Sequence, residues 1–283
     1  MRFFIVDAFS ATAFGGNPAG VVLLGGDSRF PSDELMVHIA AELRYSETAF
    51  VRQDGPTEFT VRYFTPRAEV DLCGHATIAT FGVLWREGIV AGGAVCRNHT
   101  LAGTLEVSAG QQVLMQMARP TVIERDIDTA RLQRVMTGGP ALPSMSWPVE
   151  IVSTGLPDII LPVADVATLN ALRPDMDALA ALSHELGVTG VHAFAMRDDG
   201  LTAHARNFAP LYGVPEESAT GTANGALTHY LQRRGAITPG TTCRFMQGEA
   251  MGRPSVVTTL LQRDGDICVG GECCIIACGE LTI

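Results

Sequence analysis

The sequence predicts an α+β protein built from two similar lobes, and two observations lead to this prediction. A series of short motifs occurs twice, at an offset close to half of the 283 residues. Each half also contains many strand-like segments and one long helix-like run that directly follows a glycine turn. With 47% hydrophobic and 18% charged residues, the chain has the composition of a protein with a well-filled core.

The repeated series has three parts, which come in the same order in both halves. They are a Phe-x-Pro segment, a glycine turn and a Leu-x-Arg-x-Gly helix end, at residues 64–66, 72–77 and 84–88 and again at residues 208–210, 219–224 and 231–235. Two unrelated helix starts would explain a shared glycine but not this shared order. We therefore expect lobes over residues 1–120 and 121–283, related by internal duplication, with a terminal strand able to cross between them and the glycine turns facing one another across a cleft.

The individual elements follow from hydrophobic periodicity and from turn residues. In the first half, strands are expected over residues 2–9, 20–24, 48–51, 57–65, 94–97, 101–108 and 112–117, with helices over 34–43 and 76–86. In the second half, strands are expected over 149–153, 159–163, 191–196, 201–208, 242–246, 256–262, 267–269 and 274–277, with helices over 129–136, 174–186 and 223–234 and a loop over 137–148.

The balance of charge excludes several classes of function. A net charge of −10 argues against a nucleic-acid partner, because phosphate binding relies on clustered cationic side chains. All 20 basic residues are arginine. The chain therefore has no lysine to form a Schiff base with pyridoxal phosphate or a carbonyl substrate, or to serve a phosphate-binding P-loop.

The seven cysteines indicate buried thiols in a reducing compartment. Cys274 and Cys278 have the spacing of half of a zinc site, but no second pair completes it. No apolar run approaches the ~20 residues that cross a membrane, and the N-terminus does not resemble a signal peptide. We expect a cytoplasmic protein that uses no metal and does not bind a membrane.

The first glycine turn carries the most chemistry, because Asp71, Cys73 and His75 crowd into it. Gly74 is expected to give the turn its conformational freedom. The amides that follow begin a helix, where they lack intrahelical partners and bind anions. By itself the turn fits a carboxylate-binding site, a cysteine nucleophile or a purely structural helix start.

Glu47 is the second candidate. It stands at the entrance of a strand, flanked by hydroxyls and followed by apolar residues that would partly desolvate it. Desolvation raises the pKa of a carboxyl group toward the range useful for proton transfer. The alternative is a surface glutamate at the end of a strand.

Taken together, Glu47, residues 71–77 and residues 219–223 make the chain resemble the PhzF family of phenazine-biosynthesis-like proteins. Residues 16–19, 153–157 and 247–255 fit the family as well, so the resemblance spans the chain. It implies the fold of diaminopimelate epimerase and proline racemase, in which each of two lobes is a curved, mostly antiparallel sheet around a central helix. It also implies an active site between the lobes and a homodimer.

The resemblance assigns roles by position. Glu47 matches the proton-shuttling glutamate, and His75 the histidine of the first glycine turn. The second turn would hold a substrate carboxylate through its amides and a hydroxyl. The residues expected in the site are the catalytic Glu47, His75 and Glu217 and the substrate-binding Asn17, Gly74, Thr220, Gly221 and Thr222.

Two positions depart from the family pattern. Glu217-Ser218 stands where the family often has Asp-Pro, and Thr222 where it often has serine. The longer Glu217 side chain would reshape the pocket while keeping a carboxylate. The related epimerases use one cysteine at each turn, whereas this chain has Cys73 and Thr220, and a threonine hydroxyl is too weak a base to replace a thiolate. A two-thiol racemase is therefore disfavoured, and Cys73 is expected to be a packing residue.

These residues predict a cofactor-independent isomerase or epimerase that moves a proton on a small cyclic or unsaturated carboxylate, with Glu47 as the acid and base. The resemblance implies the isomerisation of a dihydro-hydroxyanthranilate as the founding activity. One alternative is a non-catalytic scaffold of the same fold that binds a small acid or a protein. The other is a hydrolase or transferase that depends on Cys73, although residues two apart on a turn are expected to point in different directions.

Overall fold

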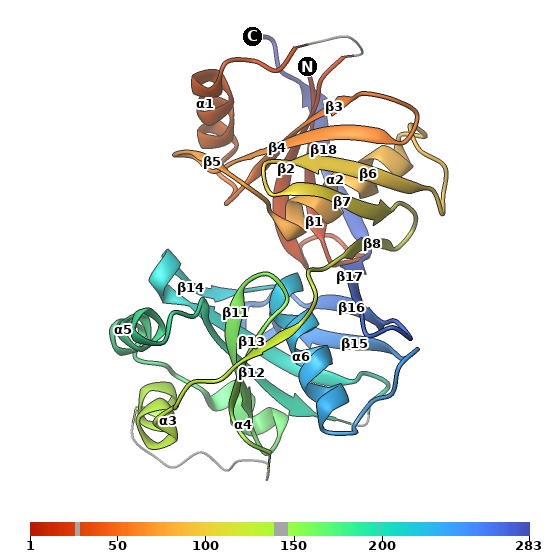
Figure 1. Cartoon of the computed structure of the whole chain (residues 1–283). Coiled ribbons are helices and arrows are strands. Elements are labelled where there is room, and N and C mark those ends of the chain that lie inside the picture. The colour runs from red at the N-terminus through yellow and green to blue at the C-terminus, as the bar shows by residue number, and fades with distance from the viewer. Residues whose placement is uncertain (26–28, 139–146, 198) are drawn as a thin grey trace. The chain divides into compact units, whose positions relative to one another are not determined.

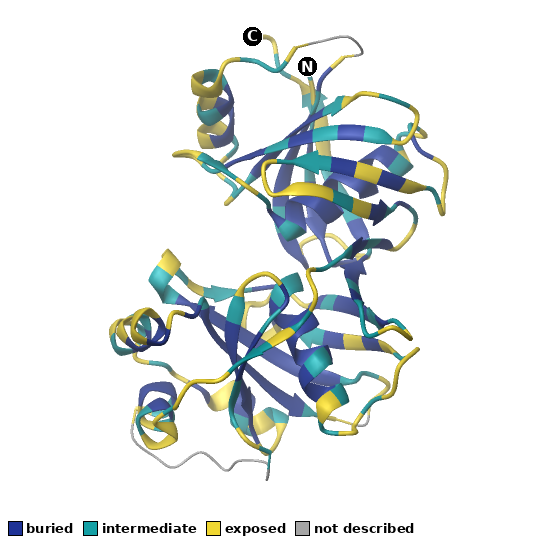
Figure 2. Ribbon diagram, in the orientation of Figure 1, coloured by how far each residue is buried: buried dark blue, intermediate teal, exposed yellow. Residues whose placement is uncertain are grey.

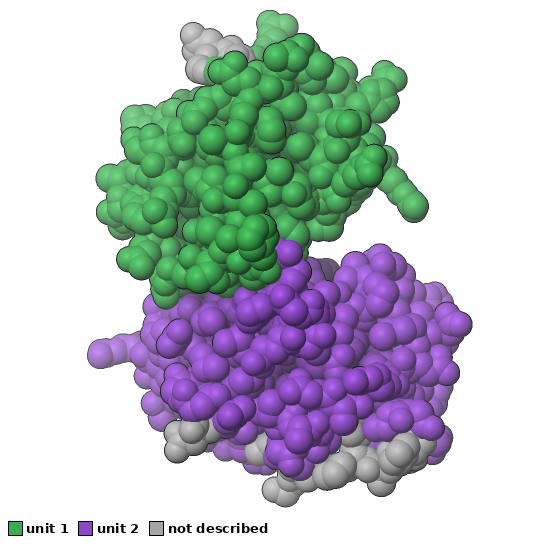
Figure 3. Space-filling view, turned by 180° about the vertical axis from the view of Figure 1, so that it is seen from behind, with its two compact units in different colours: residues 1–116, 270–283 green, residues 117–269 purple. Residues whose placement is uncertain are grey.

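The computed structural model describes residues 1–25, 29–138, 147–197 and 199–283 and has an α+β fold (Figure 1). Residues 139–146, within the loop expected over 137–148, lie outside the described part. The chain divides into two compact units, which Figure 3 colours separately. Unit 1 comprises residues 1–116 and 270–283, and unit 2 comprises residues 117–269.

Unit 1 is a mixed sheet with two helices. Its strands are β1 (Arg2–Ala8), β2 (Asn17–Leu23), β3 (Thr48–Gln53), β4 (Glu58–Phe64), β5 (Glu69–Val70), β6 (Val95–Thr100), β7 (Gly103–Ser108), β8 (Val113–Gln116) and β18 (Cys273–Glu280), and its helices are α1 (Asp33–Leu43) and α2 (Gly74–Arg86). Strand β1 pairs antiparallel with both β18 and β2. The sheet then continues with β3 parallel, β4 antiparallel, β6 parallel, and β7 and β8 antiparallel.

Unit 2 has more helices around a sheet of the same kind. Its strands are β9 (Thr121–Ile123), β10 (Glu150–Ser153), β11 (Pro157–Pro162), β12 (Gly190–Met196), β13 (Ala203–Ala209), β14 (Val214–Glu217), β15 (Thr242–Gln247), β16 (Ser255–Leu261) and β17 (Ile267–Gly271). Its helices are α3 (Thr129–Thr137), α4 (Val166–Ala171), α5 (Met176–Leu186) and α6 (Gly221–Arg233), with 3₁₀ turns at Pro210–Tyr212 and Glu249–Met251.

The strands pair in the same succession in the two units. From β1 to β7 the pairs run antiparallel, parallel, antiparallel, parallel and antiparallel, and the same succession runs from β10 to β16. Strands β5 and β14 attach to β4 and β13 in the same way. The repeated Phe-x-Pro segments end the equivalent strands β4 and β13, and the repeated glycine turns begin α2 and α6.

Each unit wraps its sheet around one central helix, α2 in unit 1 and α6 in unit 2. Helix α2 packs on β1, β2, β3, β8 and β18, and α6 packs on β10, β11, β12 and β16. Both helices are buried over most of their length (Figure 2). Close packing of α2 requires Gly82, where a Cβ would lie 2.8 Å from the Cys273 Sγ. Both helices begin two residues earlier than the sequence predicts, at the glycine itself.

The opposite faces of the sheets are covered by the remaining helices. In unit 1, α1 packs Met36, Ile39 and Ala40 against Phe50 and Phe64. In unit 2, α3, α4 and α5 cover a larger apolar cluster on β10, β11 and β12. Helix α4 and the short strands β5, β9 and β14 were not predicted, because segments this brief show too little periodicity.

A core substitution in unit 1 tests this packing. The Phe50 ring is fully buried and stands edge-to-face on Phe64, with centroids 5.6 Å apart. Phe50→Ala should lower the free energy of unfolding by about 3–5 kcal/mol, because it removes buried surface and leaves a cavity. Leu101→Ala, at an exposed position, is the control and should change it by no more than about 0.5 kcal/mol. Equal effects in urea titrations would contradict the assigned core.

Candidate active site

The first glycine turn is the N-terminus of α2. Cys73 is the N-cap, with an extended φ of −137°, and its side chain makes no capping hydrogen bond. Gly74 does not adopt a left-handed φ, so the expectation that it supplies conformational freedom is wrong. A Cβ at Gly74 would meet only the Met115 Cε, at 3.9 Å, among the described atoms. Glycine therefore leaves space in front of the helix amides, which bind anions.

Glu47 lies directly before β3, at the end of the sheet where the parallel strands β2 and β3 begin. Its backbone carbonyl accepts a hydrogen bond from the Gly20 amide at 3.2 Å, which ties it to β2. Its side chain is 21% exposed, unlike that of a surface glutamate. Asn17, also buried, begins β2 at the same end.

The side chains of Glu47, His75 and Cys73 form one cluster. Glu47 Oε2 lies 3.3 Å from His75 Nε2, and Cys73 Sγ lies 3.4 Å from His75 Nδ1. Ser46 Oγ approaches the same imidazole, at 3.4 Å from Nε2. The expectation that Cys73 and His75 point apart is therefore wrong. Glu47 Oε2 is shielded from solvent without an aligned hydrogen-bond donor among the described groups, so its contact with His75 is a close ion pair.

This cluster sets the charges of its members. Burial raises the pKa of a carboxyl group, but in Glu47 the close contact with His75 and its charge outweigh burial and lower the pKa below its ordinary 4.5. Burial also opposes charge on His75, yet contacts with Cys73 and Glu47 raise its pKa well above 6.5. Burial raises the pKa of the Cys73 thiol. The Glu47 carboxylate thus lies beside an imidazole whose pKa is raised, and the expected rise of the Glu47 pKa is wrong.

The same three side chains are close enough to share a metal ion. The ligand atoms of Glu47, Cys73 and His75 lie within 4.8 Å of one another, and carboxylate, thiolate and imidazole are all zinc ligands. Metal binding would require His75 and Cys73 to lose their protons. Metal coordination and acid–base chemistry therefore exclude one another at this cluster.

The second glycine turn is the N-terminus of α6. Thr220 is its N-cap, with an extended φ of −126°, and its hydroxyl does not cap the helix. Instead, Thr220 Oγ1 donates to Glu217 Oε2 at 2.6 Å. Gly221 and Thr222 are the first two helical residues, and the Thr222 carbonyl accepts from the Thr154 hydroxyl at 2.9 Å. The structure thus groups the four predicted residues of this turn.

Gln247 fixes this turn from β15 and was missed as a site residue. Its Oε1 accepts from the Thr220 amide at 3.2 Å and from Asn224 Nδ2 at 2.8 Å. Its Nε2 donates to the Glu217 carbonyl at 2.8 Å and contacts Thr220 Oγ1 at 3.1 Å. The sequence signal was the motif around Gln247-Gly248, which fits the family but does not reveal a contact with a turn far away in the chain.

The two units do not carry equivalent acid–base groups. Thr48 lies opposite Phe64, and Val191 lies opposite the equivalent Phe208, so Gly190 is the counterpart of Glu47. A Cβ at Gly190 would lie 1.8 Å from the Phe208 carbonyl oxygen. Unit 2 therefore cannot place a carboxylate at this position, and the Glu47 cluster has no second copy there.

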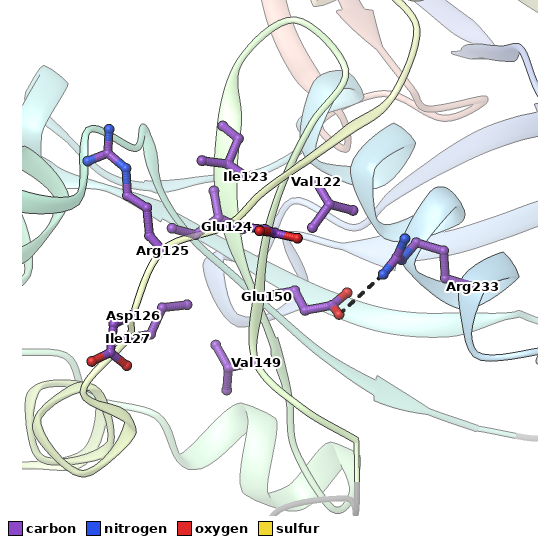
Figure 4. A pocket seen from close by; sticks show the side chains of 10 residues that line it. Val122, Ile123, Glu124, Arg125, Asp126, Ile127, Val149, Glu150 and Arg233 are labelled. Atoms are coloured by element: carbon purple, nitrogen blue, oxygen red, sulfur yellow. Dashed lines mark ion pairs between the residues drawn. The ribbon is translucent and has the colours of Figure 1, made fainter.

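A cavity of about 480 Å³ in unit 2 has no part in this chemistry (Figure 4). Its wall comes from β9, residues 124–127, β10 and Arg233, which pairs with Glu150 at 3.7 Å. Arg233 ends α6, so the cavity lies at the opposite end of this helix from Gly221. None of the residues predicted for the site lines it.

Comparison with known proteins identifies the family. The Phenazine biosynthesis-like protein family matches residues 6–278, and the chain belongs to this family. An uncharacterized isomerase of Deinococcus radiodurans is 36% identical over 267 residues, covering 90% of this chain and 85% of that protein. The trans-2,3-dihydro-3-hydroxyanthranilate isomerase of Pseudomonas chlororaphis is 31% identical over 274 residues, covering 90% and 88%. The protein is an isomerase.

Solved structures confirm the predicted fold class. The PhzF family protein of Bacillus anthracis superimposes with a TM-score of 0.88 at 25% identity, covering 100% of this chain and 99% of that one. A probable proline racemase of Agrobacterium radiobacter has a TM-score of 0.64 at 15% identity, covering 100% and 93%, and this likeness concerns the fold alone. The epimerase-like fold of two similar halves is thus confirmed.

Thiol chemistry tests the state of Cys73. Cys73 is buried and Cys278 is exposed. In the native protein at pH 7, Cys73 should react with a disulfide reagent such as DTNB at least about tenfold more slowly than Cys278, because the thiolate is the reactive form and burial disfavours it. Cys73→Ala and Cys278→Ala assign the two rates. Rapid stoichiometric labelling of Cys73 would instead support a cysteine nucleophile.

Proposed function

We propose that this isomerase moves a proton between carbon atoms of a small cyclic or unsaturated carboxylate, without a cofactor, and that Glu47 is its acid and base. The observation that carries the proposal is the Glu47–His75 pair, a carboxylate 3.3 Å from an imidazole and shielded from water. Both lie beside the open N-terminus of α2, which Gly74 leaves uncrowded. A base next to a site for developing negative charge is what carbon–proton transfer requires.

In the proposed reaction, Glu47 removes the proton from carbon and returns it to another carbon of the same substrate. The imidazolium of His75 keeps Glu47 ionised in the resting site and stabilises negative charge as it develops on the substrate. Because the pKa of His75 is raised, it holds this positive charge at neutral pH. The unpaired amides at the start of α2 add a second source of stabilisation.

The second glycine turn is proposed to hold the substrate carboxylate. Its amides at Gly221 and Thr222 begin α6 without a side-chain cap from the described residues. Glu217 and Gln247 fix Thr220 through its hydroxyl and amide, which makes the turn rigid before any ligand binds. Such preorganisation lowers the entropy cost of binding.

The proposed substrate class is a small ring carboxylate. The P. chlororaphis relative is named for trans-2,3-dihydro-3-hydroxyanthranilate, an unsaturated ring acid. We propose a substrate of this chemical class but not this identity, because Glu217 is longer than the aspartate that the resemblance leads us to expect. Asn17, which is buried at the start of β2, is proposed as a further substrate contact.

A Cys73-dependent hydrolase is the second candidate, and the 3.4 Å contact with His75 favours it. The raised pKa of the thiol opposes it, because the thiolate is the nucleophile.

We also propose a homodimer in the cytoplasm with no nucleic-acid partner. Among the helices that the structure describes, none is long and apolar enough to cross a membrane.

Substitution of Glu47 tests the proposal most directly. Ring carboxylates that raise the melting temperature are incubated with the protein in D₂O and EDTA, and exchange at carbon is followed by proton NMR. Glu47→Gln should slow exchange by about 10²–10⁴-fold, because the amide is not a base, while Glu42→Gln on the exposed face of α1 should leave it unchanged. Full exchange in Glu47→Gln would overturn the assigned base. Binding without exchange in the wild type would favour a scaffold.

The pH dependence tests the role of His75. In the wild type the pKa of Glu47 is lowered by His75, so activity that needs the carboxylate should be lost only as pH falls below 4.5. In His75→Asn, burial remains without the positive charge, so the pKa of Glu47 should rise and the acidic limb of kcat/KM should move to higher pH. An unmoved acidic limb would show that His75 does not set the charge of Glu47.

A further inference from the structure

A buried polar cluster lies under the second glycine turn, apart from the groups assigned above. Asp158 on β11, His192 on β12 and Asn207 on β13 occupy the sheet face that α6 covers, each two residues from Ile160, Phe194 or Ala205 of its apolar core. Asn224, on α6, completes the cluster on the helix side of the sheet. The exposed fractions of these four residues are 1%, 0%, 1% and 0%.

Gly190 makes this cluster possible. It lies opposite Asp158 in the parallel pair of β11 and β12, and it has no side chain to stand between Asp158 and β13. Asn207 Nδ2 therefore lies 3.5 Å from Asp158 Oδ1, and 3.4 Å from His192 Nδ1. The same glycine that removes a counterpart of Glu47 thus brings a different carboxyl group into the core.

The cluster is joined to Glu217 through side chains already described. Asn224 Nδ2 donates to the Thr220 carbonyl at 2.9 Å and to Gln247 Oε1 at 2.8 Å. Gln247 and Thr220 in turn bond Glu217. Across the sheet, Asn207 and Glu217 are paired residues of β13 and β14. The ionisable groups that face Asp158 are therefore Glu217 and His192.

Hydrogen-bond counting indicates the protonation state of Asp158. Four buried atoms of the cluster have no partner among the described residues: Asp158 Oδ2, His192 Nε2, Asn207 Oδ1 and Asn224 Oδ1. Because Asn207 Nδ2 can only donate, His192 Nδ1 accepts from it and Nε2 carries the hydrogen. If Asp158 Oδ2 is also protonated, it and His192 Nε2 are two donors for the two acceptors, Asn207 Oδ1 and Asn224 Oδ1. The donors can reach the acceptors directly or through one buried water. An ionised Asp158 would leave three acceptors, one donor and an unpaired buried charge.

We propose that Asp158 is a positioning residue that is held as a neutral carboxylic acid beneath the second glycine turn, where its proton allows Glu217 to carry the negative charge that orders the turn. The order of ionisation follows from location. Glu217 is partly exposed and accepts from Thr220, whereas Asp158 is enclosed and forms no ion pair with a described residue. Two nearby carboxyl groups do not both ionise readily, so the enclosed one keeps its proton.

The electrostatic environment agrees with this assignment. Burial first, and then the negative charge of Glu217, raise the pKa of Asp158 from 3.8 to about 7, although Asn207 opposes the shift. Burial lowers the pKa of His192 to about 4, so the imidazole is neutral and cannot neutralise an aspartate. Ionisation of Asp158 above neutral pH would add a second negative charge below the turn, which by the proposed function receives the substrate carboxylate.

Carboxyl NMR tests the assignment without reference to any activity. In protein labelled with ¹³C at the aspartate carboxyl carbon, one signal should titrate near neutral pH; it should be lost in Asp158→Asn and kept in the control Asp126→Asn, at an exposed position. Glu217→Gln should move the Asp158 midpoint to lower pH, because a like charge is removed. An acidic Asp158 midpoint, or one unmoved by Glu217→Gln, would overturn the proposal even if the protein is an isomerase.

Stability provides the second readout. The carboxyl is ionised in the unfolded chain above 3.8 but keeps its proton in the folded chain up to about 7. The Tm of the wild type relative to Asp158→Asn should therefore fall as pH rises between these values and then level off. Asparagine keeps one donor and one acceptor, whereas Asp158→Leu removes both and should melt lower. A Tm difference that stays constant across pH would contradict a neutral Asp158 carboxyl. An equal loss of Tm in Asp158→Asn and Asp158→Leu would contradict it as well.

The catalytic consequence is tested separately and rests on the proposed function. If isomerisation is found, Asp158→Asn should retain activity at pH 5.5 and lose an inflection of KM near pH 7, while kcat changes little, because the turn binds the substrate. An inflection that remains in Asp158→Asn would show that Asp158 does not act on the turn. Absence of isomerisation would leave the NMR and stability results, and the assignment of the proton, in place.

Discussion

The burial of one helix inside each sheet is the constraint on which the rest of the structure depends. Helix α2 and helix α6 are enclosed over most of their length, so each must present small residues to its neighbours, as Gly82 does to Cys273. At the N-terminus of each helix, the amides of the first turn have no partners within the helix. The fold therefore produces a helix end with free amides in each unit, of the kind that suits an anion, and the two copies differ in what surrounds that end.

Those surroundings have diverged under backbone constraints that local sequence does not reveal. In unit 1, Glu47 faces His75 across the start of two parallel strands. In unit 2 the equivalent position is Gly190, which the Phe208 carbonyl keeps free of a side chain. The two units therefore differ in content. Unit 1 holds the Glu47–His75 pair, and unit 2 holds the turn that Glu217 and Gln247 order. At the position of Gly190, unit 2 therefore has no counterpart of the Glu47 carboxylate.

Much of this organisation could be predicted from the sequence, because it is encoded by short repeated patterns. The two glycine turns and the Phe-x-Pro segments identify equivalent elements, and resemblance to a family selects Glu47 and His75. The contacts of Gln247 and Asp158 could not be predicted, because they join residues far apart in the chain through strand order. The Cys73–His75 contact was predicted wrongly, since an extended N-cap followed directly by a helix brings the two side chains together.

The pairing of β1 with β18 has a consequence for how the protein is made. Unit 1 needs β18, where Cys273 packs against Gly82 and its thiol donates to the Ile78 carbonyl. On the ribosome, β18 emerges only after the whole of unit 2, which is a continuous segment of the chain. The half that carries Glu47 and His75 is therefore completed last, after the whole of the second unit has been synthesised.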